Sequence, residues 1–292
     1  MALSVVLDGR FDGGHSRHVA RLVARLGLAG VWLRQPWPAG IVTSAASSGT
    51  TLASLGAEMA SFPVGLVADA DDVDPDILQA LTQTSAGGEA PGGAGLVVAT
   101  PTSGLRLALT GTAAGLARWQ RWIAVRPSLS AVEIAVAVAE AGDPVQPGRA
   151  VPAFGGAVFV PFAAGRDLAA AVANAAVVAA GRSVWVEIAV SVGRTTAEAR
   201  ARADTEELFA LLGNPGRDGL FGTLEECQEA AARLAHAGAT ELICYLPRSS
   251  DLPDVLAQLR AIAVGAGVLR PGGPPSSPPP PPVGWGGRRP TA

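Results

Sequence analysis

The sequence contains no lysine. All 22 of its basic residues are arginines, in a chain of 292 residues with a net charge of −3. This absence excludes Schiff-base catalysis by lysine, a P-loop lysine and a lysine general base. The 36 glycines, the 23 prolines and the abundant alanine indicate codon bias in a GC-rich genome as the origin of the missing lysines.

The sequence also lacks long apolar runs, an excess of positive charge and a cluster of metal-binding residues. No apolar run reaches the roughly 18 uninterrupted residues that a membrane-spanning helix needs. The net charge argues against a nucleic-acid partner. The three histidines and two cysteines are too scattered for a metal site. Cys227 and Cys244 lack CxxC spacing and are interpreted as small core side chains.

The two ends of the chain lead to separate expectations. Met1 runs almost directly into a strand-like segment, which leaves no room for a signal peptide, so we expect a cytoplasmic protein with reduced thiols. Residues 269–292 are rich in proline and glycine and are predicted to form a disordered tail. Residues 1–268, with the hydrophobic content of a globular domain, are predicted to form the folded part.

Strand-like and helix-like segments alternate through residues 1–268. Nearly continuous apolar runs, typical of strands buried on both faces, predict eight main strands. They are 3–8, 30–34, 64–68, 105–110, 131–138, 157–162, 184–192 and 241–246. A further run at 95–100 is too close to 105–110 for a parallel crossover, so only one of the two is expected in the main sheet.

Eight strands interleaved with helices predict an α/β fold of the TIM (β/α)8 barrel type. The competing architecture is a doubly wound open sheet, which normally carries GxGxxG after its first strand; residues 8–14 do not fit that pattern. Helix starts are indicated by capping-box spacing at Thr195 with Glu198 and at Thr223 with Glu226.

Several polar residues near predicted strand ends are candidates for chemistry. Asp8 ends the first strand, at the catalytic face of a barrel, and is either a substrate-orienting carboxylate or a loop acid. His15 begins the first helix and is either a proton donor or a local hydrogen-bonding group. Glu133 and Glu187 interrupt apolar strands; pointing inward, either one would have a raised pKa and could act as a general acid.

A possible anion site follows the fourth strand. Thr110, Gly111 and Thr112 combine hydroxyl groups with the start of a helix, an arrangement suited to a cofactor phosphate and also common at ordinary strand–helix junctions.

Three stretches of the sequence resemble the bacterial luciferase-like family of flavin- and deazaflavin-dependent oxidoreductases. The N-terminal stretch, LSVVLD followed by HVARLVARLGLAGVWL, resembles the family's first strand, first helix and second strand. GAVFVPF with RDLAAAVANAAVVAAGR resembles the family's sixth strand and helix. VWVEIAVSVGRTTAEARARA and FGTLEECQEAAARLAHAGATELICYLP resemble its seventh and last strand–helix units.

The resemblance implies a barrel that binds FMN or the deazaflavin coenzyme F420 at the carboxyl-terminal ends of its strands. The family often carries an acid and a histidine after the second strand, whereas this chain has Arg34 and Gln35. The resemblance implies cofactor contacts for Gln35, Trp37 and Asp69. Trp37 could equally pack in the core or in a lid, and the acids that follow Asp69 could equally form a solvated turn. The family's phosphate loop corresponds here to the acidic residues 139–143, for which Arg149 and Arg166 are the nearest compensating cations by sequence.

These observations lead to one preferred function and two alternatives. The preferred one is F420-dependent hydride transfer to a C=C or C=N bond of a small substrate, as in the compact reductases of alkylproline-containing antibiotic pathways. The composition favours an actinobacterial source, where F420 is common. The alternatives are an FMN-dependent monooxygenase and a non-catalytic barrel relative. The resemblance also implies a homodimer.

Overall fold

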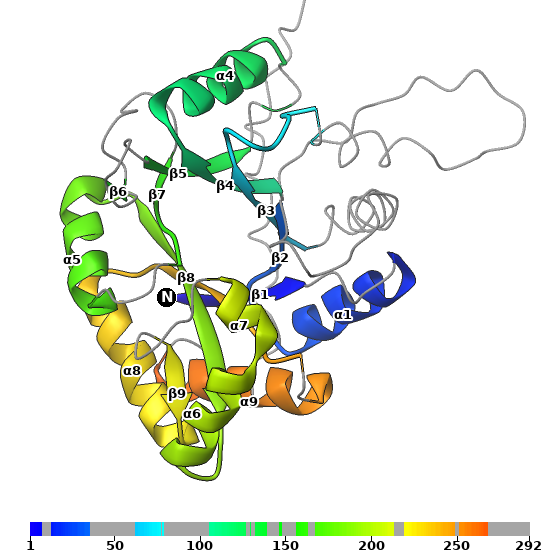
Figure 1. The fold of residues 1–292 in the computed structure, drawn as a ribbon, viewed down its shortest axis with the longest axis vertical. Helices are drawn as coiled ribbons and strands as arrows, with labels where there is room; N and C mark the ends of the chain where they lie inside the picture. The colour runs from blue at the N-terminus through cyan, green and yellow to red at the C-terminus, as the bar shows by residue number, and fades with distance from the viewer. Residues whose placement is uncertain are drawn as a thin grey trace, which may run out of the picture.

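The computed structural model describes residues 1–7, 13–35, 62–76, 78, 105–126, 129, 132–138, 146–147, 156–162, 167–212, 219–248 and 251–267. Within these ranges the chain forms a closed parallel barrel surrounded by helices (Figure 1). The hydrogen-bonded order is β10-β1-β2-β3-β4-β5-β7-β8, and pairing of β8 with β10 closes the ring.

The barrel strands correspond one for one to the eight predicted strands. They are β1 (Ala2–Leu7), β2 (Val31–Gln35), β3 (Val64–Asp69), β4 (Leu105–Gly111), β5 (Glu133–Val138), β7 (Ala157–Val160), β8 (Ser183–Val192) and β10 (Glu241–Tyr245). The TIM-barrel prediction is therefore confirmed, and the open doubly wound sheet is excluded by the closing pair. Residues 95–100 lie outside the described ranges, as do 51–60 and 269–292.

Seven helices are described. They are α1 (Gly13–Arg25), α4 (Ala113–Ala124), α5 (Leu168–Ala179), α6 (Thr196–Thr205), α7 (Glu207–Leu211), α8 (Leu224–Ala237) and α9 (Leu252–Gly265). None of the helices in this part of the chain has the length and apolar character needed to cross a membrane.

Helix ends follow the local chemistry of the sequence. Thr223 and Glu226 form the predicted capping box at the start of α8, and Gly238 ends that helix in the left-handed conformation. Thr195 caps α6, but Glu198 accepts instead from the backbone N–H of Arg194. The short elements α7, β6 (Gln146–Pro147) and β9 (Leu220–Gly222) were not predicted, because two to five residues carry no readable periodicity.

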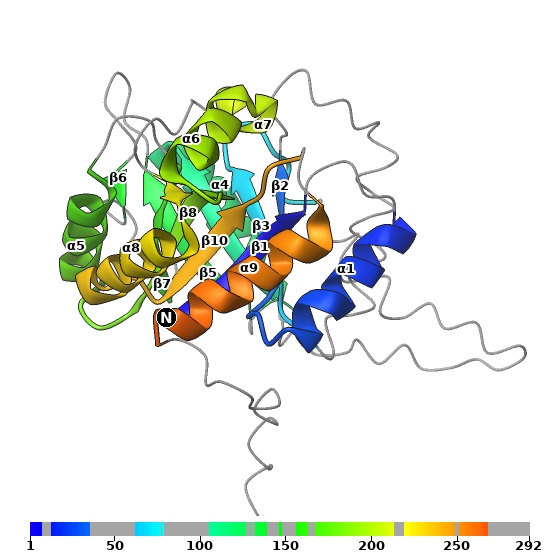
Figure 2. The same cartoon turned by 90° about the horizontal axis from the view of Figure 1, so that it is seen from below.

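Two apolar clusters divide the core. One lies between the barrel wall and the surrounding helices and contains both cysteines, as predicted. The other fills the barrel with large rings from Trp32, Phe159, Trp185 and Tyr245, packed against small residues such as Ala108, Ala135, Ala137 and Ala189. Leu208 and Phe209 of α7 join this inner cluster. Figure 2 shows α6 and α7 at the end of the barrel toward which the strands point.

Candidate active site

Side chains of three barrel strands meet inside the carboxyl-terminal half of the barrel. Nη1 of Arg34, on β2, donates to Oε1 of Glu187 on β8 at 2.5 Å and to the hydroxyl of Tyr245 on β10 at 3.0 Å. The Tyr245 hydroxyl in turn donates to Oε1 of Glu187. The backbone N–H of Phe162, just beyond β7, donates to Oε2 of Glu187 at 2.9 Å. These four residues are called the Arg34 cluster below.

Burial and pairing determine the charge states of the cluster. The Glu187 side chain is fully buried and that of Arg34 is 25% exposed. Burial opposes the charge on Arg34, but Glu187 and Tyr245 more than offset this and raise its pKa. Burial raises the pKa of Tyr245 well above its ordinary value. Tyr245 is therefore a neutral phenol at physiological pH, able to accept from Arg34 and donate to Glu187.

One edge of the Arg34 guanidinium remains available. Both cluster bonds of Arg34 use Nη1. No group in the described part of the chain accepts a hydrogen bond from its Nε or Nη2. Since a guanidinium is a planar fork of donors, the free Nε–Nη2 edge can hold two acceptor atoms side by side.

Strand alternation places Arg34 and the predicted cofactor contact Gln35 on opposite faces of β2. Trp32 lies in the inner cluster, and Arg34, two residues on, shares its face of β2. Gln35 is half-buried and belongs to the opposite face of the strand. Arg34 therefore points into the barrel, and the cofactor contact of Gln35 stays a prediction.

Asp69 is the last residue of β3, the neighbour of β2, and Thr110 is the last but one of β4. They are paired in the sheet register, and each is two residues beyond an inner-face residue, Val67 or Ala108. One carboxylate oxygen of Asp69 accepts from the backbone N–H of Asp71 at 2.9 Å. The structure thus brings the predicted residues Asp69 and Thr110 to the carboxyl-terminal end of the barrel.

The start of α4, predicted as a phosphate site, holds an acid of the chain itself. The Asp71 carboxylate accepts from both the backbone N–H and the hydroxyl of Thr112, each at 2.7 Å. A side chain at Gly115 would meet Oδ1 of Asp71 at 2.3 Å, so glycine makes room for this carboxylate. Since Asp71 supplies the anion here, we do not assign Thr110, Gly111 and Thr112 to a cofactor phosphate.

Glu133 lies at the amino-terminal end of the barrel, away from the Arg34 cluster. It is the first residue of β5, its side chain is 41% exposed, and its carboxylate is 3.6 Å from Nε of Arg106. Burial, followed by the nearby Glu241, raises its pKa, while Arg106 lowers it. This position is that of a stability residue, so the catalytic prediction for Glu133 is not carried forward.

A buried network closes that amino-terminal end. Glu241 accepts from the Ser4 hydroxyl at 2.5 Å, the Trp32 indole at 3.1 Å and Nη1 of Arg106 at 2.7 Å. Arg106 also lies over the Trp185 ring, 5.9 Å from its centroid. These five residues and Glu133 are called the lower network.

The other predicted site residues are not placed by side-chain contacts. Asp8, Trp37, Arg149 and Arg166 lie outside the described residues. His15 belongs to the first turn of α1, but its side chain is not described.

Two residues of the Arg34 cluster were underrated or missed from the sequence. Glu187 was considered only as a possible general acid, and Tyr245 was not considered at all. The signal for Tyr245 was its position as the last residue of β10, and the signal for Glu187 was an acid in the middle of the apolar strand β8, in contrast to Glu133 at the start of its strand.

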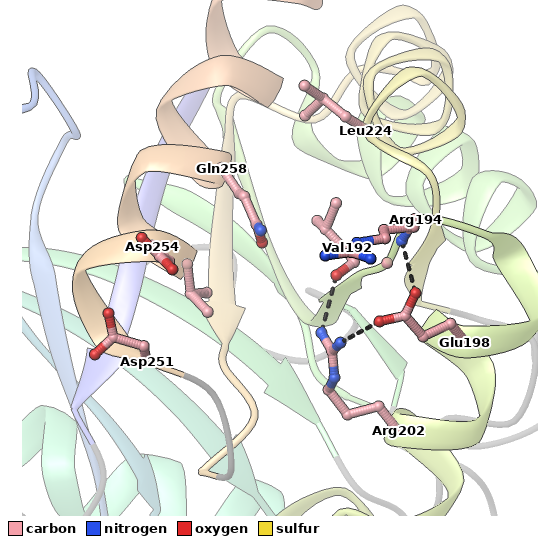
Figure 3. Close-up of a pocket in the computed structure, with 10 residues that line it drawn as sticks. Val192, Arg194, Glu198, Arg202, Leu224, Asp251, Asp254 and Gln258 are labelled. Atoms are coloured by element: carbon pink, nitrogen blue, oxygen red, sulfur yellow. Dashed lines mark hydrogen bonds and ion pairs between the residues drawn. The ribbon is translucent and has the colours of Figure 1, made fainter.

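A separate cavity of about 500 Å³ lies outside the barrel wall, between α6, α8 and α9 (Figure 3). It is lined by Val192, Gly193, Arg194, Glu198, Arg202, Leu224, Asp251, Asp254, Val255 and Gln258. Arg202 donates to the Val192 carbonyl at 2.9 Å and to Glu198 at 3.1 Å. This outer groove combines charges of both signs, and its arginine Arg202 is already paired within the chain.

Comparisons with known proteins agree on the fold. No protein-family model matches the sequence, and no curated protein does. Among solved structures, EDTA monooxygenase from Chelativorans sp. BNC1 matches with a TM-score of 0.58 at 11% identity over 92% of this chain and 95% of that one. A monooxygenase from Streptomyces bottropensis matches at 0.56 and 14% identity, over 92% and 98% of the chains.

A third structure is the coenzyme F420-dependent tetrahydromethanopterin reductase from Methanopyrus kandleri. It matches with a TM-score of 0.55 at 11% identity, over 89% of this chain and 97% of that one. These likenesses confirm the barrel fold that the sequence resemblance implied.

Proposed function

We propose that this chain is an oxidoreductase of the luciferase-like family that binds a flavin or deazaflavin at the carboxyl-terminal end of its barrel. The observation that carries the proposal is the Arg34 cluster, which places a partly exposed guanidinium at the end where barrel enzymes hold their substrates. The neighbours that share the fold include two monooxygenases and an F420-dependent reductase.

The residues at this end suit a flat ring with one apolar and one polar part. The Phe162 ring is partly exposed and packs edge-on against Tyr245, with 6.1 Å between centroids. Arg34 offers hydrogen bonds and positive charge next to it. When bound, the cofactor supplies the hydride, and the chain supplies binding, orientation and electrostatics.

The cluster is built to hold this guanidinium still. Glu187 receives hydrogen bonds on both oxygens, so its position is fixed, and it fixes Nη1 of Arg34 in turn. A charged group held in place costs little reorganisation when a ligand's charge changes during reaction. Arg34 would thus position the polar edge of a ligand and stabilise negative charge on it.

Within this family we propose F420-dependent hydride transfer to a C=C or C=N bond of a small molecule. One feature of the chain supports the deazaflavin: its GC-rich composition favours an actinobacterial source, where F420 is common. Gln35, Trp37 and Asp69 remain predicted cofactor contacts, with Asp8 and His15 as predicted catalytic groups. Arg149 and Arg166 remain predicted phosphate contacts.

The test is a side-by-side titration of the full-length chain with F420 and with FMN, followed by the fluorescence of each cofactor. We expect saturable quenching of F420 at lower concentrations than of FMN. The matched variant is Arg34→Met with Glu187→Gln, which removes both charges of the cluster together and should bind more weakly. Tighter binding of FMN would favour the monooxygenase, and binding of neither cofactor would overturn both enzyme functions.

A further inference from the structure

The Arg34 guanidinium has more donors than the described part of the chain uses. Nη1 alone makes both of its cluster bonds. Glu187 meanwhile accepts from Arg34, Tyr245 and the Phe162 backbone, so its burial is satisfied without the other edge of the guanidinium. The Nε–Nη2 edge is therefore not needed to balance the buried acid.

The free edge also has the exposure that a binding group needs. The Arg34 side chain is 25% exposed, whereas the Glu187 side chain is fully buried. Glu187 and Tyr245 fix the guanidinium through its Nη1 atom, which reduces the conformational entropy that Arg34 would lose on binding a ligand. A pre-positioned arginine fork matches two acceptor atoms in one plane.

The charges around the free edge set what can bind there. Glu187 neutralises part of the Arg34 charge through Nη1. Among the described residues, Asp69 is a second acid at this end, on the neighbouring strand β3, and one of its oxygens already accepts from the backbone N–H of Asp71. A ligand must therefore bring its own negative charge and two adjacent acceptors to compete with water at this edge.

We propose that the Nε–Nη2 edge of Arg34 is a receptor for a planar anion with two adjacent acceptors. Two sources have this chemistry: the carboxylate of a substrate, and the negatively charged pyrimidine edge of a reduced flavin or deazaflavin ring. The second source rests on the proposed function, whereas the first requires only that a ligand enters this end of the barrel. Arg34 is then the residue that determines charge specificity at the site.

The first arm of the test uses the full-length chain without cofactor and needs no oxidoreductase activity. The probes are 4-fluorobenzoate and its neutral counterpart 4-fluorobenzamide, followed by broadening of the fluorine NMR signal. We expect saturable binding of the carboxylate and none of the amide. In the Arg34→Met, Glu187→Gln double variant the affinity for the carboxylate should fall about tenfold to a hundredfold.

Single variants separate recognition from folding. Glu187→Gln keeps the fork and removes the internal anion, so it should bind 4-fluorobenzoate several-fold more tightly. Arg34→Lys keeps a positive charge beside Glu187 but loses the two-donor edge, so it should fold and bind weakly. Arg121→Gln removes an exposed arginine of α4 and should leave the affinity unchanged.

The second arm distinguishes the two sources. If the edge receives a substrate carboxylate, 4-fluorobenzoate should still bind when F420 is saturating. If it receives the ring, bound cofactor should displace the probe, and Arg34→Lys should lose the preference for reduced over oxidised F420. Failure of F420 and FMN to bind would remove the proposed function and leave the first arm intact. The receptor is contradicted if 4-fluorobenzoate fails to bind the wild-type chain, or binds it and the double variant equally.

Discussion

At the residue scale, glutamates that look alike in the sequence make different contacts because they lie at different positions along their strands. Glu187 lies in the middle of β8 and accepts a hydrogen bond from the guanidinium of Arg34. Glu241 begins β10 and accepts three hydrogen bonds at the opposite end of the barrel. Glu133 begins β5, and its side chain is 41% exposed. The sequence shows that Glu133 and Glu187 are acids within apolar strands. Their level in the barrel, and whether each side chain points inward or outward, follow only from the sheet register.

Removing the acceptor of the lower network should be costly. Glu241→Gln would place an amide N–H₂ against Nη1 of Arg106 or leave Ser4 and Trp32 without their acceptor. We expect a loss of about 3 kcal/mol in the free energy of unfolding, measured by chemical denaturation. Glu133→Gln is the matched control and should change it by less than about 1 kcal/mol. Equal losses of stability in the two variants would contradict the conclusion that Glu241, and not Glu133, is the essential acceptor of the lower network.

Glu133 should also contribute to the pH dependence of stability. Its pKa is raised in the folded state, mainly by burial, so folding favours the protonated acid. This contribution is fully present below the ordinary value of 4.5 and is lost as the pH rises above it. Glu133→Gln should therefore gain stability relative to wild type between pH 4 and pH 7. Denaturation midpoints of both proteins at pH 4 and pH 7 check this prediction. It would be contradicted if the stability of the variant relative to wild type fell between pH 4 and pH 7.

At the element scale, the barrel strands could be predicted because each is a nearly continuous apolar run. The helices could be predicted because their capping residues lie within a few positions of the helix ends. The site could be predicted only as far as strand ends. That Arg34 points inward follows from the alternation along β2, which the sequence does not give because a one-residue change in the start of a strand exchanges its two faces. The sequence suggests a phosphate at Thr112 because it does not show that Asp71, 41 positions away, reaches the same helix start.

Gly65 on β3 shows how one element shapes its neighbour. A Cβ atom at this position would lie 2.2 Å from the ring of Trp32, which is 1% exposed on the adjacent strand β2. Gly65→Ala should cost about 2–3 kcal/mol in the free energy of unfolding, because the ring cannot move without disturbing the inner cluster. Gly156→Ala serves as the control, since nothing lies within 4 Å of its added methyl group. Similar denaturation midpoints for both variants would mean that Trp32 has room to shift.

At the scale of the whole molecule, the closed ring makes burial of the core a property of the complete barrel. Cys227 and Cys244 lie on different elements, α8 and β10, within the same outer cluster. Burial raises the pKa of the Cys227 thiol to about 12 and raises that of Cys244 as well. Both thiols are therefore protonated and covered in the native state.

Thiol reactivity should report opening of the barrel. We expect neither cysteine to react with an aromatic disulfide reagent at pH 8 in the native protein, and both to react in denaturant. Their rates of modification under native conditions should agree with each other, because both depend on unfolding of one core. Rapid labelling of a single cysteine in the native state would show that its part of the outer cluster opens independently.

Binding of a flavin or deazaflavin at the carboxyl-terminal end of the barrel is tested most directly by amide hydrogen exchange with and without saturating F420. We expect the cofactor to slow exchange in peptides that contain Arg34, Asp69 and Phe162, and to leave α5 and the outer groove unchanged. Protection confined to the groove peptides around Arg194 and Asp254, or no protection anywhere, would contradict binding at this end.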